Sequence, residues 1–429
     1  MMRAESWAMD ATVEVAVIGA GQGGLAVSWL LEEARVHHVV LERGAIGESW
    51  RSQRWDSFCL NTPNWCNSLP GLEFHEDDPD GFGHRDELVS YFERYVRRFD
   101  LPVEQHTPVS AVERGPTGVY EVRTSRRNIR ARAVVLASGS MSRPRVPAVA
   151  GRLPKDILSI SAGEFRNADV LPAGAVVVVG SGQSGAQIAE DLLAAGRNVF
   201  LCASRVARVP RVYRGRDVVA WWRDMGFLDV GVEELEEPSA RFAAQPQVSG
   251  TNGGHTVSLQ SLARDGATLL GRVTDVRGAT ITLAGDLLES ITFGDEKSRS
   301  FKAAMDEWID SRGIAAEPAT PDPGEPSLPD LNGSDECLEL DLRDAGIACI
   351  IWCTGFDADW SWVDVDVFDQ HGRPRHHGGI TESPGLYFIG HPWLSKRSSG
   401  ILLGVKDDAA RIVAHIRRDV LHAGRCPAS

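Results

Sequence analysis

The sequence predicts an α/β fold of two units, each a parallel sheet flanked by helices, with the second unit inserted into the first. Two observations predict it. An apolar run, a glycine-rich turn and a helix-like stretch occur in that order twice, with turns at residues 19–24 and 180–185. Further apolar runs of strand length, at residues 133–139, 347–355 and 386–390, lie on both sides of the second turn, as an interrupted parallel sheet requires.

The composition is that of a folded, water-soluble chain. Of 429 residues, 43% are hydrophobic and 24% are charged, and the formal net charge is −14. These values argue against disorder and against non-specific binding to nucleic acid or an anionic membrane. The apolar runs are too short to cross a bilayer, and the first residues lack an apolar signal-peptide core. We therefore expect a cytoplasmic protein that binds neither nucleic acid nor a membrane.

The first turn reads Gly19-Ala20-Gly21-Gln22-Gly23-Gly24 and lies between an apolar run over 13–18 and a helical pattern over 25–34. In such a turn the first glycine allows a tight reversal, and the second lets the backbone approach a pyrophosphate. The third glycine lets the helix pack closely on the strand. The helix N-terminus adds free N–H groups and a partial positive charge, so this turn predicts a dinucleotide site.

The second turn, Gly180-Ser181-Gly182-Gln183-Ser184-Gly185, has the same context, between an apolar run over 175–179 and a helical pattern to residue 195. One such turn is weak evidence, because glycine-rich turns also occur for packing reasons. Two in the same context predict two Rossmann-like dinucleotide-binding domains.

The residues that follow the second strand of each unit differ in charge. Glu42 comes 23 residues after Gly19, where a carboxylate can accept hydrogen bonds from the hydroxyls of an adenosine ribose. The second unit has Ser204 and Arg205 at that place, and a guanidinium there favours a 2′-phosphate. We expect FAD or NAD at the first site and NADPH at the second, the alternative for Arg205 being a solvated loop residue. Two more arginines follow, Arg208 and Arg211.

The order of these segments predicts the domain boundaries. Residues 1–150 and 336–429 form the first domain, and residues 151–335 form the inserted second domain. The segment 315–329 is rich in Pro, Asp and Glu and predicts a surface loop.

Neither a redox disulfide nor a metal site is expected. The seven cysteines contain no Cys-x-x-Cys pair, which a zinc knuckle or a thioredoxin-type pair would need. His371, His376 and His377 lie close together in the sequence, but no acidic or cysteine partner has ligand spacing.

The chain resembles the class B flavoprotein monooxygenases, which include the flavin-containing monooxygenases, the plant indole-pyruvate enzymes and, more distantly, the Baeyer–Villiger enzymes. Besides both glycine turns, residues 55–65 are similar to a flavin-containing monooxygenase pattern, with Trp55, Asn61 and Pro63 in register. Residues 47–51 look like the family's Gly-x-x-Trp turn near the flavin. Ser161 stands where members usually carry a histidine that affects coupling between the two domains.

The resemblance implies FAD on the first domain and NADPH on the second. The residues expected to bind FAD are Gly19, Gly21, Gln22, Gly24, Glu42, Arg43, Trp50, Ser138 and Gly139. The residues expected to bind NADPH are Gly180, Gly182, Gln183, Ser184, Gly185, Ser204 and Arg205. Asn61 is expected to be catalytic, holding a nicotinamide or oxygen near the flavin C4a atom, the alternative being a turn asparagine that caps the backbone before Pro63.

The implied activity is that of an FAD- and NADPH-dependent monooxygenase. Such an enzyme forms a flavin C4a-hydroperoxide with dioxygen and oxygenates nitrogen, sulfur or a carbonyl carbon of a small organic substrate. An NADPH-dependent flavin reductase or oxidase with another electron acceptor is the alternative, and a redox sensor without turnover is a third reading. The sequence leaves the oligomeric state open, a homodimer being one arrangement.

For two segments that contain aromatic or histidine residues, the sequence is compatible with two roles. Trp221 and Trp222 lie in a charged segment that predicts either an amphipathic helix or a lid. Residues 391–397, directly after the run 386–390, are expected either to contact flavin or substrate or to serve the fold alone.

Overall fold

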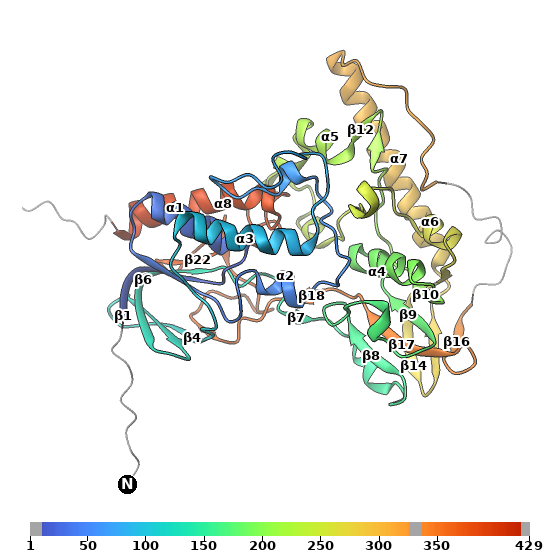
Figure 1. The fold of residues 1–429 in the computed structure, drawn as a ribbon, viewed down its shortest axis with the longest axis horizontal. Coiled ribbons are helices and arrows are strands. Elements are labelled where there is room, and N and C mark those ends of the chain that lie inside the picture. The colour runs from blue at the N-terminus through green and yellow to red at the C-terminus, as the bar shows by residue number, and fades with distance from the viewer. Residues whose placement is uncertain (1–10, 326–336, 422–429) are drawn as a thin grey trace, which may run out of the picture.

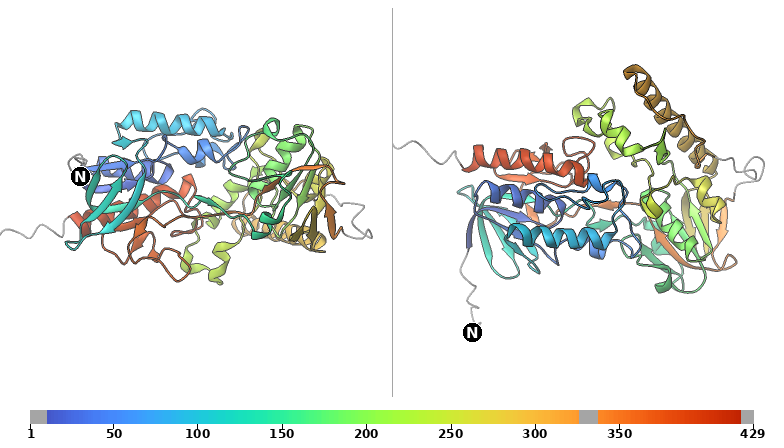
Figure 2. Two further views of the ribbon diagram at one scale, coloured as in Figure 1. Left: turned by 90° about the horizontal axis from the view of Figure 1, so that it is seen from below. Right: turned by 45° about the horizontal axis from the view of Figure 1, so that its top comes forward.

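The structure, a computed structural model, describes residues 11–325 and 337–421. It contains two α/β units, which lie side by side in all views (Figures 1 and 2). The first unit holds both ends of the described chain, and the second unit is built mainly from the middle of the sequence.

The first unit is organised around a buried parallel strand. β1 (Ala11–Ile18) pairs in parallel with β2 (His38–Leu41) on one side and with β6 (Asn128–Leu136) on the other. β3 (Val103–Glu104) and β22 (Leu386–Phe388) extend the parallel part of the sheet. The apolar runs that predicted these strands are buried on both faces, as parallel strands under helices require.

Helices and an antiparallel extension complete the first unit. The helices that run along the sheet in Figure 1 are α1 (Gln22–Glu33), α3 (Arg85–Phe99) and α8 (Leu402–His415). The antiparallel extension consists of β4 (Val109–Arg114) and β5 (Tyr120–Thr124), and β19 (Val363–Asp364) pairs in parallel with the outer edge of β4. A side branch is formed by β20 (His376–His377) and β21 (Ile380–Thr381).

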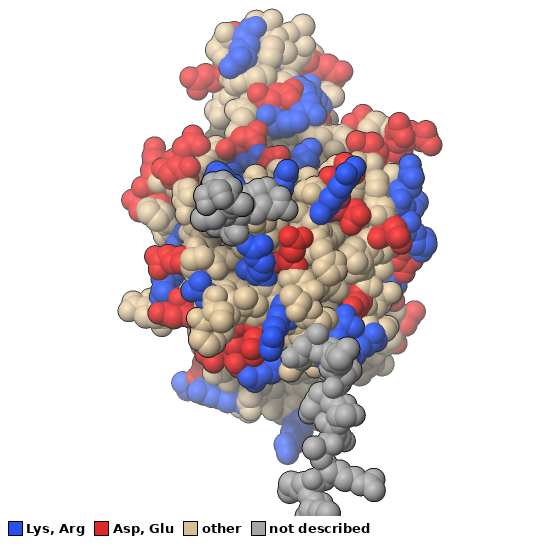
Figure 3. Space-filling view, turned by 90° about the vertical axis from the view of Figure 1, so that its left-hand side faces the viewer, with Lys and Arg blue, Asp and Glu red and all other residues tan. Residues whose placement is uncertain are grey.

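Charges of both signs are mixed on the end of the molecule that the first unit forms. In Figure 3 basic and acidic side chains alternate over that face. Arg123 of β5 and Glu113 of β4, for example, form an ion pair of 2.9 Å across neighbouring strands. Interspersed charges produce no strong field of one sign.

The second unit has a five-stranded parallel sheet in the order β13-β10-β9-β17-β8. Its strands are β8 (Leu158–Ser161), β9 (Ala175–Val179), β10 (Val199–Cys202), β13 (Thr268–Leu270) and β17 (Ile347–Trp352). Helices α4 (Gln183–Ala194) and α6 (Leu259–Arg264) pack beside it. A three-stranded antiparallel sheet of β14 (Val273–Arg277), β15 (Thr280–Leu283) and β16 (Glu339–Asp341) adjoins it.

The predicted boundary at residue 336 needs a correction. β16 pairs with β15, and β17 lies between β9 and β8 in the second sheet. The second unit therefore continues to residue 352, and only the chain beyond it returns to the first sheet. The apolar pattern of β17 predicted a buried strand correctly, but such a pattern does not show which sheet a strand joins.

A third group of elements leaves the second sheet and covers the junction with the first unit. It contains a hairpin of β11 (Val212–Tyr213) and β12 (Arg216–Asp217), the short helix α5 (Val218–Asp224) and the long helix α7 (Leu287–Arg312). Trp221 and Trp222 of α5 are buried in an apolar cluster with Met305 and Ile309 of α7, so the structure shows a packed helix. Residues 315–325 form the predicted loop, and 326–329 lie outside the described residues.

The two strand–turn–helix units depend on the absence of side chains at the turns. Gly19 and Gly180 have φ values of +111° and +100°, which residues with a Cβ rarely adopt. A Cβ on Gly24 would overlap the carbonyl oxygen of Gly19, and one on Gly185 would overlap that of Gly180. A Cβ on Gly182 would meet nothing within 4 Å. The third glycine is thus needed for packing, while the second faces open space.

This difference gives a stability prediction for the second turn. Gly185→Ala should lower the free energy of unfolding by about 2 kcal/mol, because the new methyl group must push α4 away from β9. Denaturant unfolding measures the change. Gly182→Ala is the matched control and should stay within about 0.5 kcal/mol of the original chain; equal losses in both variants would contradict the packing argument.

Candidate functional site

Glu42 lies beside the first glycine turn as an ordered acceptor. Its side chain is 6% exposed, its Oε2 accepts from the backbone N–H of Ala20 at 2.8 Å, and its Oε1 accepts from that of Gly44 at 2.9 Å. Each carboxylate oxygen has two lone pairs, so one on each stays available to a hydroxyl. This arrangement fits an adenosine ribose at the end of β2.

The remaining predicted residues of the first site surround the same turn in different roles. Ser138 and Gly139 follow β6, and the Cα of Ser138 would lie 3.3 Å from a Cβ on Gly19. Gly139 has φ +78° and faces open space. Gln22 is already bonded, since its Nε2 donates to the carbonyl oxygen of Gly400 at 2.7 Å. Arg43 is exposed, and Trp50 lies in α2 (Glu48–Ser52).

At the second turn, one predicted residue serves the fold. The Gln183 side chain holds the backbone of Val248, donating from Nε2 to the carbonyl at 2.5 Å and accepting the N–H at Oε1 at 3.1 Å. Ser184 is partly exposed at the start of α4, and the N–H of Ser204 donates to the Oγ of Ser181 at 2.9 Å. The open ligand-facing part of this turn is therefore Gly182 and the N-terminus of α4.

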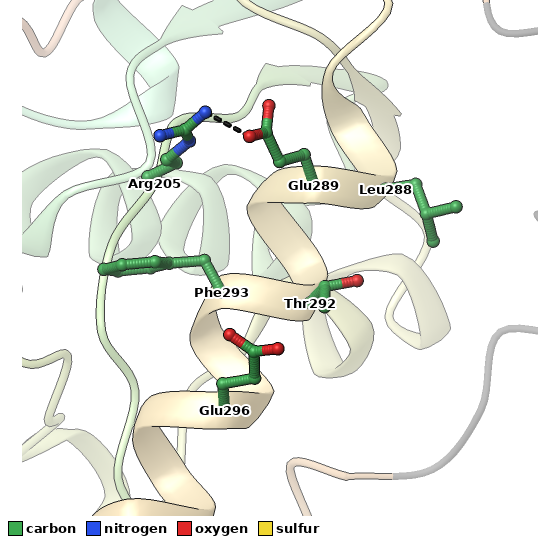
Figure 4. Close-up of a pocket in the computed structure, with 6 residues that line it drawn as sticks. All are labelled: Arg205, Leu288, Glu289, Thr292, Phe293 and Glu296. Carbon is green, nitrogen blue, oxygen red and sulfur yellow. Dashed lines mark hydrogen bonds and ion pairs between the residues drawn. The ribbon is translucent and has the colours of Figure 1, made fainter.

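The three arginines after β10 differ in burial. Arg208 is ion-paired with Asp322 at 2.8 Å and Arg211 with Asp217 at 2.7 Å, and both guanidinium groups are buried. Arg205 is exposed and pairs with Glu289 at the start of α7. Both residues line an open hollow of about 450 Å³, and Figure 4 shows how the two side chains face each other. Of these three arginines, Arg205 alone is exposed to solvent.

Asn61 lies where the two units touch. Its Oδ1 accepts from the Nε2 of Gln187 on α4 at 2.8 Å, and its carbonyl oxygen accepts from a terminal nitrogen of Arg211 at 2.7 Å. A Cβ on Gly250 would overlap the carbonyl oxygen of Leu60, so the second unit also packs against the preceding residue. The role of Asn61 in chemistry remains a prediction, and its position is set by the second unit.

Residues 391–400, here called the junction loop, also contact both units. Its Gly400 accepts the bond from Gln22 at the first turn, and the N–H of Arg397 donates to the carbonyl of Val230 in the second unit at 2.9 Å. The N–H of Val232 donates back to the carbonyl of Ser395 at 3.1 Å. The junction loop is therefore fixed between the first glycine turn and the segment after α5.

Several polar atoms of the junction loop are buried without a hydrogen-bond partner. They are Nε2 of His391, Nε1 of Trp393 and Nε of Arg397. A buried donor without an acceptor is costly, and Trp393 also has φ +55°, which is unfavourable for a bulky residue. Similar unpaired atoms occur elsewhere, for example Nε1 of Trp29 and Nε of Arg127, but here they coincide with a strained backbone, a combination found at ligand-binding surfaces.

The electrostatics of the junction loop suit a dry site. Burial lowers the pKa of His391 to about 4, so its ring is neutral at pH 7 and retains one acceptor nitrogen. Burial also lowers the pKa of Arg397, whose guanidinium lies 4.0 Å from the ring centre of Phe227 and 4.6 Å from that of Trp393.

The sequence pointed to residues 391–397 as a candidate contact of flavin or substrate. Nothing in the sequence singled out Gln187 as the partner of Asn61.

Ser161, in the place of the family histidine, has a local structural role at the end of β8. Its Oγ donates to Oε2 of Glu164 at 2.7 Å, and its N–H donates to the same oxygen at 2.8 Å. Its side chain is buried. It therefore closes the turn after β8.

Three features absent from the described residues bear on the chemistry. Within 11–325 and 337–421, no group of three metal-ligating side chains is close enough to hold a metal ion, and the cysteines of these same segments are unpaired. Among the helices described, none is both long enough and apolar enough to cross a membrane.

Comparisons with known proteins agree with this architecture. Residues 16–211 match the family model described as pyridine nucleotide-disulphide oxidoreductase. An uncharacterized CzcO-like oxidoreductase of Geobacillus kaustophilus is 29% identical over 95% of this chain and 99% of its own length. The indole-3-pyruvate monooxygenase YUCCA4 of Oryza sativa subsp. japonica is 32% identical over 43% of this chain and 46% of its own.

A solved structure shows the same fold. The flavin-containing monooxygenase from Stenotrophomonas maltophilia superposes with a TM-score of 0.65 at 18% identity, covering 95% of this chain and 99% of its own. The predicted α/β fold and the expectation of an oxidoreductase are confirmed. The match of residues 16–211 to the pyridine nucleotide-disulphide oxidoreductase model agrees with this fold, and the resemblance of the chain to class B flavoprotein monooxygenases is confirmed.

Proposed function

We propose that this protein is an FAD- and NADPH-dependent monooxygenase that oxygenates a small organic molecule at nitrogen, sulfur or a carbonyl carbon. One observation carries the proposal. The junction loop is bonded both to Gln22 at the first glycine turn and to Val230 of the second unit, so groups bound at the two turns would meet beside it. The similarity to a flavin-containing monooxygenase and to a plant monooxygenase supports the proposed reaction.

The residues at the first turn fit FAD. The backbone at Gly21 faces open space at the N-terminus of α1, where a pyrophosphate finds free N–H groups. Glu42 offers a carboxylate for the ribose, and Gly139 leaves room beyond β6. The unpaired nitrogens of His391, Trp393 and Arg397 would face the polar edge of a flavin or of its substrate.

The residues at the second turn fit NADPH. Gly182 is open in the same way at the N-terminus of α4, and Arg205 lies at the end of β10, where the adenosine ribose of a coenzyme binds in this fold. Its exposed guanidinium can bind a 2′-phosphate with two parallel hydrogen bonds.

Bound FAD would supply the redox chemistry, taking a hydride from NADPH and activating dioxygen as the C4a-hydroperoxide that the resemblance implies. The protein's own residues would position the reacting groups and shield them from water. Asn61, held through Gln187 and Arg211, presents its side-chain amide at the junction. Buried aromatic residues such as Trp393 and Phe58 would keep water out, and a dry site strengthens every polar contact within it.

The proposal predicts oxygenation coupled to NADPH. Protein reduced by NADPH without oxygen and then mixed with oxygenated buffer should show the absorbance of a flavin hydroperoxide. With substrate, one oxygenated product should form for each NADPH and each dioxygen. Rapid electron transfer to a dye without oxygenated product would instead identify the alternative, an NADPH-dependent reductase or oxidase. Purified protein that binds no flavin would contradict both.

Asn61→Ala should reduce the yield of oxygenated product per NADPH by about tenfold, equivalent to about 1.4 kcal/mol for one lost hydrogen bond. FAD should stay bound, because the first turn is untouched. Product and NADPH are measured together, and flavin content is read from absorbance. Thr62→Ala, next in the chain and bonded to Asn67, is the control. An unchanged yield in Asn61→Ala would reduce Asn61 to a turn residue.

Arg205→Ala tests the coenzyme assignment. It should raise the KM for NADPH by about tenfold, equivalent to about 1.4 kcal/mol for a lost charge-assisted contact, and leave the KM for NADH nearly unchanged. Steady-state oxidation of both coenzymes measures this. Arg277→Ala on β14, an exposed arginine outside the hollow, should affect neither. Equal effects of Arg205→Ala on both coenzymes would remove the NADP assignment.

A further inference from the structure

The hollow beside Arg205 carries carboxylates as well as the arginine. It is lined by Arg205 after β10 and by residues from the first turns of α7, namely Leu288, Glu289, Thr292, Phe293 and Glu296. α7 packs directly on the segment after β10, since a Cβ on Gly294 would lie 3.4 Å from the carbonyl oxygen of Val206. Helix α7 therefore supplies one wall of the place where the adenosine ribose of the coenzyme is expected.

Figure 4 shows how these side chains are oriented. The Glu289 carboxylate points at the guanidinium of Arg205, while Phe293 and Glu296 follow on the next turns of the same side of α7. Both members of the pair are more than half exposed, at 58% for Arg205 and 56% for Glu289. A pair this exposed is weak and exchanges partners easily. Nearby, Lys297 lies 5.5 Å from the ring centre of Phe293 but does not line the hollow.

A 2′-phosphate and a free ribose hydroxyl would experience this pair differently. A phosphate must take Arg205 from Glu289 and then lie close to a like-charged carboxylate, which is unfavourable. A ribose with two free hydroxyls can donate to Glu289 while Arg205 stays paired, which is the role that an acidic residue has in sites for NAD. The hollow therefore contains one residue that favours NADPH, Arg205, and one that favours NADH, Glu289.

We propose that Glu289 is a coenzyme-specificity residue: it competes with the 2′-phosphate of NADPH for Arg205 and accepts hydrogen bonds from the ribose of NADH. The chain thus uses both coenzymes. Arg205 makes the affinity for NADPH higher than that for NADH, and the carboxylate of Glu289 makes this difference smaller. This inference rests on the proposed coenzyme site at the second glycine turn. It does not depend on what happens to the flavin after reduction.

The test uses binding probes that need no turnover. Calorimetry of the whole protein with 2′,5′-ADP and with 5′-AMP compares ligands that differ only in the 2′-phosphate. Glu289→Gln should increase the affinity for 2′,5′-ADP about tenfold, and this gain should shrink at high salt because the interaction is exposed. The same variant should lower the affinity for 5′-AMP, because a charged acceptor for the ribose hydroxyls is lost. Glu307→Gln, an exposed acid further along α7, is the control and should change neither affinity.

A double variant isolates the competition. In an Arg205→Ala background there is no guanidinium for Glu289→Gln to release. Most of the tenfold gain in affinity for 2′,5′-ADP should therefore disappear. Equal ratios of the two affinities in the original chain and in Glu289→Gln would overturn the inference, as would an unchanged gain in the double variant.

Anaerobic flavin reduction then separates this inference from the proposed function. Reduction of the flavin by both NADPH and NADH, with a preference that shifts toward NADPH in Glu289→Gln, supports it even if no oxygenated product is ever found. Reduction by NADPH alone, with no measurable reduction by NADH at saturating concentration, would overturn it. If the protein used NADPH alone and still formed oxygenated product, the proposed function would stand and only the proposed role of Glu289 would be wrong.

Discussion

The close approach of a helix to the end of a parallel strand, made twice, is the constraint on which the rest of this structure depends. At Gly24 and Gly185 the backbone of the helix leaves no room for a Cβ beside the preceding turn. That contact directs the N-termini of α1 and α4, with their free N–H groups, toward the ends of β1 and β9. The proposed roles of Glu42 and Arg205 in binding the two cofactors both depend on the fixed positions of these helix ends.

Two connections bring the helix ends into one site. Asn61 is bonded by its side chain and by its backbone to the second unit, and the junction loop is bonded to both units. A chemical step between two bound cofactors needs their reactive parts held in fixed geometry. Bonds that cross between the units provide that geometry more directly than either sheet does, because each sheet orients only its own nucleotide.

Buried polar atoms without a hydrogen-bond partner occur in both units, and three of them lie in the junction loop. His391, Trp393 and Arg397 each bury an unpaired nitrogen in one loop. Arg208 and Arg211 form buried ion pairs, although each also keeps one terminal nitrogen without a hydrogen bond. Natural folds satisfy buried donors wherever function does not prevent it. Arg208 and Arg211 each have a carboxylate partner, so their charge is already balanced within the fold.

The sequence by itself determined the two strand–turn–helix units, the buried strands and the acid or arginine that follows each second strand. These are local patterns, in which spacing and side-chain volume fix the backbone. Only the tertiary structure decided that β17 joins the second sheet, that Gln183 holds Val248 and that Glu289 faces Arg205. Those outcomes depend on contacts between residues far apart in the chain, and no local pattern encodes which distant partner a buried strand or an exposed charge will meet.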